Sequence, residues 1–287
     1  MPEPVRLPRT TPPAGGPSAE IPKILWTYWN QPQLDAFVQQ CVGSWHRQCP
    51  DHRVIVVGPH NVLEHVDPGD LPAQFDQLHP TKQSDWLRLY LVARHGGYWF
   101  DATTLLTCPP DWMAAQNGPS GELTGFYLEG FTQDLRYPVI ESWAFCAPAG
   151  SRFVSEWQKE FHQALVIEGT QAYLQRLRAQ PDASAVLQRI PDPEYLLIHV
   201  TAQRVMRRMP DALLTLFKAE DTAFFYHSAL RWKWYLLYPQ LCLAPGPKVP
   251  APIVKLRGGE RRHFTQLLEL HGGAAPHSLW SRALSSR

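Results

Sequence analysis

Two short groups of polar residues carry the side chains best suited to chemistry. Asp85 and Arg88 lie three positions apart, and Asp101 is followed two positions later by Thr103. If the chain stays extended after Asp101, its carboxylate and the Thr103 hydroxyl point to the same side. Such oxygen ligands suit Mg²⁺ or Mn²⁺, with diphosphate oxygens and water in the remaining positions. A cation held there would stabilise the negative charge that develops on a leaving diphosphate.

Each group also has a plainer interpretation. Asp85 and Arg88 flank the apolar stripe of a predicted helix, where they would form an ordinary surface ion pair. Asp101 would simply cap the turn that follows a strand. On the residues alone these alternatives stay open.

A helix and a strand are expected to position both groups. Four apolar residues recur at helical spacing between Thr81, the expected cap, and Gly96, which suits the end of a helix. They are Trp86, Leu89, Tyr90 and Ala93. Residues 98–100 then read as an apolar strand that delivers Asp101 at its carboxyl end, the end of the strand where open α/β sheets bind ligands.

The remaining pattern predicts one α/β domain. Strands are expected at 24–29 and 53–57, with helices at 34–45 and 61–66, and this alternation favours a parallel sheet covered by helices. Further along, helices are expected at 151–168 and 195–209, and strands at 223–226 and 232–237. Residues 1–20 contain six prolines and read as a flexible tail, which leaves 21–287 as a single domain.

Composition excludes several classes of protein. The 287 residues carry a net charge of +1, which argues against a nucleic-acid binder. No apolar run is long enough to span a membrane. The five cysteines are widely spaced, so neither a disulfide framework nor a zinc site is expected, and buried thiols in the cytoplasm fit best. Phosphate-loop, dinucleotide-binding, metalloprotease and nucleophile-elbow motifs are missing from the sequence.

The combined pattern resembles a known family. Its parts are Ser84-Asp85-x-x-Arg88, Gly96-Gly97 before an aromatic strand, Asp101-Ala102-Thr103, the opening Ile21-Pro22-Lys23-Ile24-Leu25-Trp26, and Ser142-Trp143-Ala144-Phe145. Together they resemble glycosyltransferases of the sugar-binding Asp-x-Asp region type, which include glycosyltransferase family 32 and the bacterial capsular polysaccharide synthesis proteins. The resemblance covers residues 21–155 and is thin afterwards.

This resemblance implies a GT-A type α/β fold, with a mixed, mostly parallel central sheet flanked by helices. It also implies a hexosyltransferase that uses a nucleotide-diphosphate sugar, with UDP favoured, and transfers the sugar with retention of configuration. Trp26 would hold the nucleotide base by stacking, and Asp85 would accept hydrogen bonds from hydroxyls of the donor. Ser84 and Gly97 are further donor contacts, and Arg88 would neutralise charge near the diphosphate.

The resemblance also implies a cation site, with Mn²⁺ or Mg²⁺ as cofactor. Asp101 matches the first acid of the Asp-x-Asp motif, but Thr103 stands where the second acid usually is. Either Asp101, phosphate and a C-terminal residue hold the cation, or dependence on metal is weaker than usual. His277 is the expected third ligand and His271 its alternative; the plainer interpretation of each is an ordinary surface or core histidine. Lys255 would reach the diphosphate as a point charge.

Glu141 is the residue expected nearest the reacting sugar, where it would stabilise positive charge or orient the acceptor, unless it is a solvated side chain at a strand edge. The expected acceptor is a cell-envelope or capsular polysaccharide or a glycolipid. Arg231-Trp232-Lys233-Trp234-Tyr235 is either a half-buried strand or an acceptor platform with peripheral membrane contact. A catalytically weak module that binds sugar nucleotides or serves as a scaffold is the alternative function.

Overall fold

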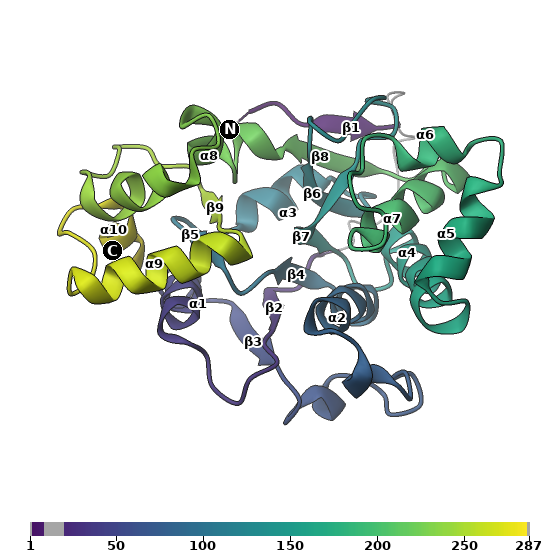
Figure 1. Cartoon of the computed structure of the whole chain (residues 1–287), viewed down its shortest axis with the longest axis horizontal. Coiled ribbons are helices and arrows are strands. Elements are labelled where there is room, and N and C mark those ends of the chain that lie inside the picture. The colour runs from purple at the N-terminus through teal and green to yellow at the C-terminus, as the bar shows by residue number, and fades with distance from the viewer. Residues whose placement is uncertain (1, 9–19, 286–287) are drawn as a thin grey trace.

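A seven-stranded sheet runs through the middle of the molecule (Figure 1). The computed structural model describes residues 2–8 and 20–285, and the strand order is β1–β8–β6–β7–β4–β2–β3. The strands are β1 (Val5–Leu7), β2 (Ile24–Tyr28), β3 (Arg53–Val57), β4 (Gly97–Phe100), β6 (Leu123–Tyr127), β7 (Ile140–Ala147) and β8 (Leu214–Lys218). Their pairings make β3, β2, β4, β6 and β8 point one way, and β7 and β1 the other. The predicted mixed, mostly parallel sheet is confirmed.

Both faces of this sheet are buried. Side chains alternate along a strand, so neighbouring residues of β4 enter different cores. Trp99 packs with Trp26 and Phe145 in one core, whereas Tyr98 packs with Leu25 in the other. Because both faces are covered, β4 is apolar throughout, as the sequence pattern indicated.

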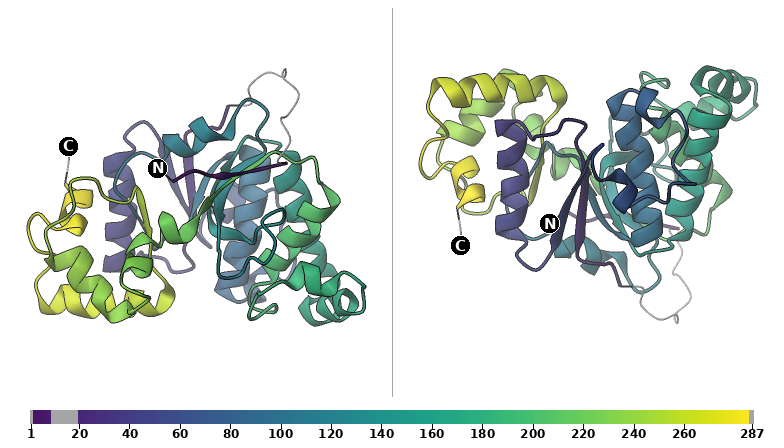
Figure 2. Two further views of the ribbon diagram at one scale, coloured as in Figure 1. Left: turned by 90° about the horizontal axis from the view of Figure 1, so that it is seen from above. Right: turned by 90° about the horizontal axis from the view of Figure 1, so that it is seen from below.

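Two groups of helices cover the two faces (Figure 2). The first packs into the core that contains Trp99 and consists of α2 (Pro80–His95), α4 (Arg152–His162), α5 (Thr170–Arg178), α6 (Ala183–Leu187) and α7 (Leu197–Arg208). The second packs into the core that contains Tyr98 and consists of α1 (Ala36–Gln48), α3 (Asp111–Asn117), α8 (Phe225–Ala229), α9 (Gly258–Leu270) and α10 (Leu279–Leu284).

Helix α2 begins and ends close to the predicted positions. Its cap is His79 and not Thr81, because Pro80 occupies the first helical position, where its missing N–H is not needed. The His79 ring accepts a hydrogen bond from the Thr81 N–H at 3.3 Å. At the other end Gly96 has a φ of 67°. This left-handed residue turns the chain directly into β4.

A small second sheet connects the C-terminal segment to the end of β4. Strand β5 (Thr104–Leu106) pairs antiparallel with β9 (Ile253–Lys255), and Thr104 lies opposite Lys255. Helix α1 holds β5 from the other side, because the fully buried Trp45 donates its Nε1–H to the Thr104 carbonyl oxygen at 2.7 Å. The segment after Asp101 is therefore fixed by long-range contacts on both sides.

Three sequence predictions are corrected here. Residues 1–20 are not entirely a tail, because Val5–Leu7 is the edge strand β1, which pairs with β8. Residues 1 and 9–19 lie outside the described part of the chain. Residues 223–226 lead into helix α8 and are not a strand. The segment 232–237 contains the 3₁₀ turn Trp234–Leu236. Arg231 and Trp232 have φ values of 50° and 58°, a conformation that a strand excludes.

Cys41, Cys49, Cys146 and Cys242 are buried thiols. Burial raises the pKa of Cys49 to about 12, so this thiol stays protonated and unreactive at neutral pH. None of the helices in the described part of the chain combines the length and apolar character needed to cross a bilayer.

The Trp45 hydrogen bond gives a test of the packing beneath the site. Trp45→Phe should lower the free energy of unfolding by about 1–3 kcal/mol, because the buried Thr104 carbonyl loses its indole partner. Urea denaturation measures this change. Leu270→Ala is the control: Leu270 is 75% exposed, and its loss should cost less than about 0.5 kcal/mol. Equal stability of Trp45→Phe and the parent protein would contradict the assignment.

Candidate active site

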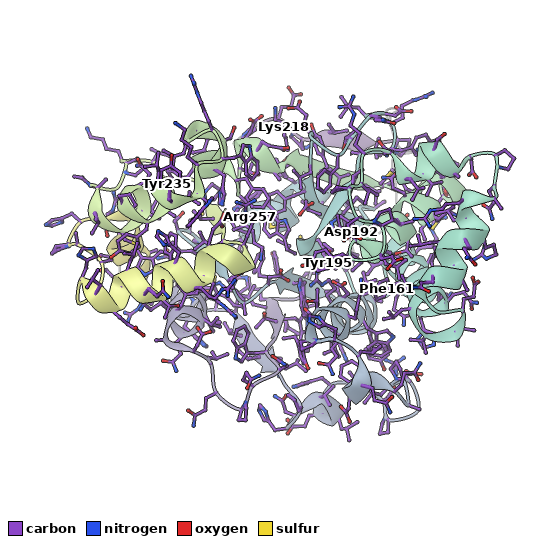
Figure 3. All side chains as sticks on the ribbon, viewed as in Figure 1. Phe161, Asp192, Tyr195, Lys218, Tyr235 and Arg257 are labelled. Carbon is purple, nitrogen blue, oxygen red and sulfur yellow. The ribbon has the colours of Figure 1, made fainter. Side chains whose placement is uncertain are left out.

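A cavity of about 1030 Å³ opens where β2 and β4 end. Tyr28, the last residue of β2, and Asp101, the first after β4, both line it. Figure 3 shows Arg257 on one side of the opening and Asp192 and Tyr195 on the other, and all three line the cavity. The cavity therefore separates the C-terminal helices from the α2–α7 side of the molecule.

Strand direction explains why distant residues meet here. β2 and β4 are parallel, so their carboxyl ends reach the same edge of the sheet. β7 is antiparallel to β4, and therefore its first residues, not its last, lie at this edge. The Asp101 N–H donates to the Trp143 carbonyl oxygen at 2.8 Å, which places Glu141 and Ser142 beside the end of β4.

Asp101 lies at the centre of the polar contacts. Its Oδ1 accepts hydrogen bonds from Arg88 Nη2 at 3.1 Å and Trp99 Nε1 at 3.2 Å, and its Oδ2 accepts one from Lys255 Nζ at 2.9 Å. Burial alone would raise the pKa of the Asp101 carboxyl, but the charges of Lys255 and Arg88 outweigh it and hold this pKa below its usual value. Asp101 is therefore ionised at neutral pH.

Arg88 joins this carboxylate to α2 and β7. One terminal nitrogen, Nη1, donates to Ser142 Oγ at 2.6 Å, and the other, Nη2, donates to Ser84 Oγ at 3.1 Å. Nη2 also lies 3.2 Å from Asp85 Oδ1. The guanidinium is 5% exposed, so its rigid fork is held by partners on both elements and is not the surface ion pair of the plainer interpretation.

Asp85 is the second carboxylate of the site, and it is 4% exposed. Burial raises the pKa of Asp85 above its ordinary value, although Arg88 and Lys82 oppose that effect. The Lys82 ammonium lies 3.8 Å away. Two neighbouring carboxylates thus have pKa values shifted in opposite directions, because Asp101 has the stronger cationic partners and Asp85 the deeper position.

Glu141 has a partner that the sequence pattern did not indicate. His199 on α7 places its Nε2 at 3.4 Å from Glu141 Oε1, and both side chains are less than a tenth exposed. Both line the cavity. The helix containing His199 was predicted, but nothing in its local pattern distinguishes this histidine from the others. The solvated interpretation of Glu141 is excluded by its burial.

Two predicted donor contacts do not line the cavity. Trp26 is 3% exposed and packs against His65 and against His95, the last residue of α2. Its Nε1 donates to the Gly96 carbonyl oxygen at 2.9 Å. It lies two residues before the end of β2, and the cavity begins at Tyr28. A Cβ at Gly97 would lie 2.6 Å from the Ile24 carbonyl oxygen, so this glycine permits close strand pairing.

Two of the predicted cation ligands line the cavity and the two histidines do not. Asp101 and Thr103 lie together at the cavity, but each is already bonded to the Lys255 ammonium at 2.9 Å. His277 is exposed in the turn before α10, and His271 stacks on Tyr238 at the end of α9. In the described part of the chain, no three His, Cys, Asp or Glu side chains come together in a way that could hold a metal. The donor set therefore does not fit a divalent cation.

The family can now be assigned. The family model described as "Capsular polysaccharide synthesis protein" matches residues 16–167, just over half of the chain. The chain belongs to this family. The family predicted from the sequence is confirmed, and the prediction of a glycosyltransferase-type enzyme agrees with it. No curated protein matches the sequence.

Comparison with solved structures finds glycosyltransferases. PaToxG glycosyltransferase is 11% identical at a TM-score of 0.41, covering 94% of this chain and 88% of that one. The galactosyltransferase LgtC, in complex with donor and acceptor sugar analogues, is 10% identical at a TM-score of 0.43, covering 86% and 95%. The glycosyltransferase GlyE of Streptococcus pneumoniae TIGR4 is 9% identical at a TM-score of 0.41, covering 92% and 62%.

The opposite pKa shifts predict opposite effects of pH on two isosteric variants. At pH 7 Asp101→Asn should be less stable than the parent protein. This difference should shrink as the pH falls below about 3.9, the pKa of Asp101 in the unfolded chain, and disappear once the pH is below its lower pKa in the folded protein. Asp85→Asn should become more stable relative to the parent protein as the pH rises above about 3.9 and through the raised pKa of Asp85 in the folded protein. The reason is that burial disfavours the ionised form of Asp85, which only the parent protein can adopt. Urea unfolding between pH 3 and pH 8 measures both, and parallel pH profiles would contradict the assignment.

Proposed function

We propose that this protein is a retaining glycosyltransferase that moves a sugar from a nucleotide-diphosphate donor to a cell-envelope or capsular glycan or glycolipid. The observation that supports this most is the meeting of Asp85, Arg88, Asp101 and Lys255 at one edge of the sheet, beside a cavity large enough for a small-molecule ligand. Membership of the capsular polysaccharide synthesis family supports the same class of reaction.

The diphosphate of the donor is expected beside Arg88 and Lys255. Both cations touch Asp101, and both line the cavity, so an added anion there would meet positive charge. Arg257, at the N-terminus of α9, also lines the cavity. We assign the sugar hydroxyls to Asp85 and Ser84, which face the cavity from α2.

An aromatic residue other than Trp26 is better placed for the nucleotide base. Trp29 follows β2 and lines the cavity, and the Arg261 guanidinium lies over its ring at 5.1 Å. We therefore transfer the stacking role expected of Trp26 to Trp29 or Tyr28. Uracil remains the favoured base, as a part of this proposal.

The reaction breaks the bond between the anomeric carbon and the diphosphate oxygen, which leaves with the electron pair. The acceptor hydroxyl oxygen forms the new bond to the anomeric carbon, and its proton passes to the departing phosphate oxygen. Arg88 and Lys255 stabilise the charge on that oxygen. Glu141, held by His199, faces the cavity where its carboxylate stabilises positive charge on the sugar or orients the acceptor.

The acceptor is expected near Trp232. This residue is 40% exposed, lines the cavity and packs under the Arg257 guanidinium at 5.4 Å. Trp234 and Tyr235 are about half exposed beyond it and suit a glycolipid at the inner face of a membrane. Action in the cytoplasm, with peripheral membrane contact, completes the proposal.

Turnover distinguishes this proposal from a binding or scaffolding module. Purified protein incubated with a panel of sugar nucleotides should slowly hydrolyse one donor. Asp101→Ala should reduce that hydrolysis by about a hundredfold or more. Arg88→Lys should reduce it by about ten- to a hundredfold, because a fork of charge-assisted hydrogen bonds is lost while the charge is kept.

The matched control is Asp51→Ala, which removes an exposed carboxylate outside the cavity lining and should leave hydrolysis unchanged. Circular dichroism and thermal unfolding establish that each variant is folded. Binding of a sugar nucleotide without hydrolysis or transfer, with glycan and glycolipid acceptors offered, would instead identify a module without catalytic activity.

A further inference from the structure

The Lys255 ammonium occupies the place where a cation was expected. Its Nζ lies 2.9 Å from Asp101 Oδ2 and 2.9 Å from Thr103 Oγ1, the two side chains of the Asp-x-Thr motif. The Thr103 hydroxyl donates its own hydrogen to the Leu256 carbonyl oxygen at 2.7 Å, so its oxygen can only accept from Lys255. One positive charge thus bridges both members of the motif.

The backbone fixes this position. Thr104 and Lys255 are register partners in the β5–β9 pair, and the Leu256 N–H donates to the Thr103 carbonyl oxygen at 3.1 Å. The Lys255 N–H donates to the Ala223 carbonyl oxygen, also at 3.1 Å. The Lys255 side chain is only 10% exposed, so it is fixed within the site and is not a mobile surface lysine.

The charges around Asp101 disfavour a second cation. Both carboxylate oxygens already accept from donors, of which Arg88 and Lys255 are positively charged. A divalent ion bound to Asp101 would lie within a few ångströms of these two cations, in a site where solvent screens poorly. Thr103 would add a neutral ligand, which is a weak replacement for a second carboxylate.

We propose that the Lys255 ammonium replaces the divalent cation of this site, so that donor binding and sugar transfer do not require metal. This inference rests on the proposed function, because it concerns how the same diphosphate is held. An ammonium has three N–H donors, of which Asp101 and Thr103 take two. The third donates to an oxygen of the diphosphate and stabilises it as the anomeric bond breaks; no bond of Lys255 itself forms or breaks.

The experiment measures nucleotide binding and donor hydrolysis by the full chain in two buffers. UDP, GDP, ADP and CDP, and the corresponding sugar nucleotides, are titrated calorimetrically in excess EDTA and in Mn²⁺. One nucleotide should bind, with dissociation constants and hydrolysis rates that agree within about twofold between the buffers. Electron paramagnetic resonance of Mn²⁺ added to the protein, with and without that nucleotide, should show no tight protein-bound ion.

Variants distinguish the effect of the Lys255 charge on nucleotide binding from the effect of its apolar packing. Lys255→Met keeps the apolar stem and should weaken nucleotide binding by about tenfold or more in EDTA, because the charge-assisted bond is lost. Lys248→Ala is the control, since Lys248 is exposed and outside this cavity. The double variant Lys255→Ala with Thr103→Asp removes the ammonium and adds a second carboxylate beside Asp101. It should show a protein-bound Mn²⁺ signal in electron paramagnetic resonance, and its nucleotide binding should depend on Mn²⁺.

The contradicting results are distinct. Loss of binding and hydrolysis in EDTA, with at least tenfold recovery in Mn²⁺, would overturn the role of Lys255 while the glycosyltransferase proposal stands. Unchanged nucleotide affinity of Lys255→Met in EDTA would overturn it as well. If no nucleotide or sugar nucleotide binds the parent protein in either buffer, the proposed function fails and this inference fails with it.

Discussion

The ion pairs of Asp101 are the constraint on which the rest of the site depends. A carboxylate at the edge of a buried sheet is costly unless cations and hydrogen-bond donors surround it. Arg88 from α2 and Lys255 from β9 meet this requirement, and they join the first half of the chain to the C-terminal segment. The same two cations line the cavity, so the residues that stabilise the Asp101 carboxylate are also the donors that the proposal assigns to an anion.

The directions of the strands bring these ion pairs and further polar residues to one edge of the sheet. Parallel β2 and β4 bring their carboxyl ends together, and antiparallel β7 contributes its first residues, including Glu141, to the same edge. Helix α2 is held over this edge by Arg88, which contacts Ser142 on β7. The cavity is therefore bounded by elements that belong to the main sheet and by the C-terminal β9–α9 segment, which supplies Lys255 and Arg257.

Local pattern predicted β2, β3, β4 and the helices α1, α2, α4 and α7, but it missed β1 and gave strands at 223–226 and 232–237 where the structure has none. Helical spacing and a terminal glycine predicted α2, and Asp101 followed an apolar strand, but the resemblance to the family was needed to predict that Asp101, Arg88 and Asp85 share one site. Contacts between residues that are far apart in the sequence could not be predicted from local pattern. The resemblance predicted Lys255 as a contact of the diphosphate, but its bond to Asp101, 154 positions away, depends on the β5–β9 pair and was not predicted. His199 reaches Glu141 from a helix without a distinctive motif. His277, the expected third ligand, lies in a turn that packs beside Gly246, and it does not line the cavity.

The most direct test of the account is a crystal structure of the protein with the preferred nucleoside diphosphate, grown in EDTA. The account requires electron density for the two phosphates inside the cavity, with their oxygens at hydrogen-bonding distance from the Lys255 and Arg88 side chains. Phosphates bound elsewhere on the surface, with the contacts of Asp101 to Arg88 and Lys255 unchanged and no anion beside them, would contradict it.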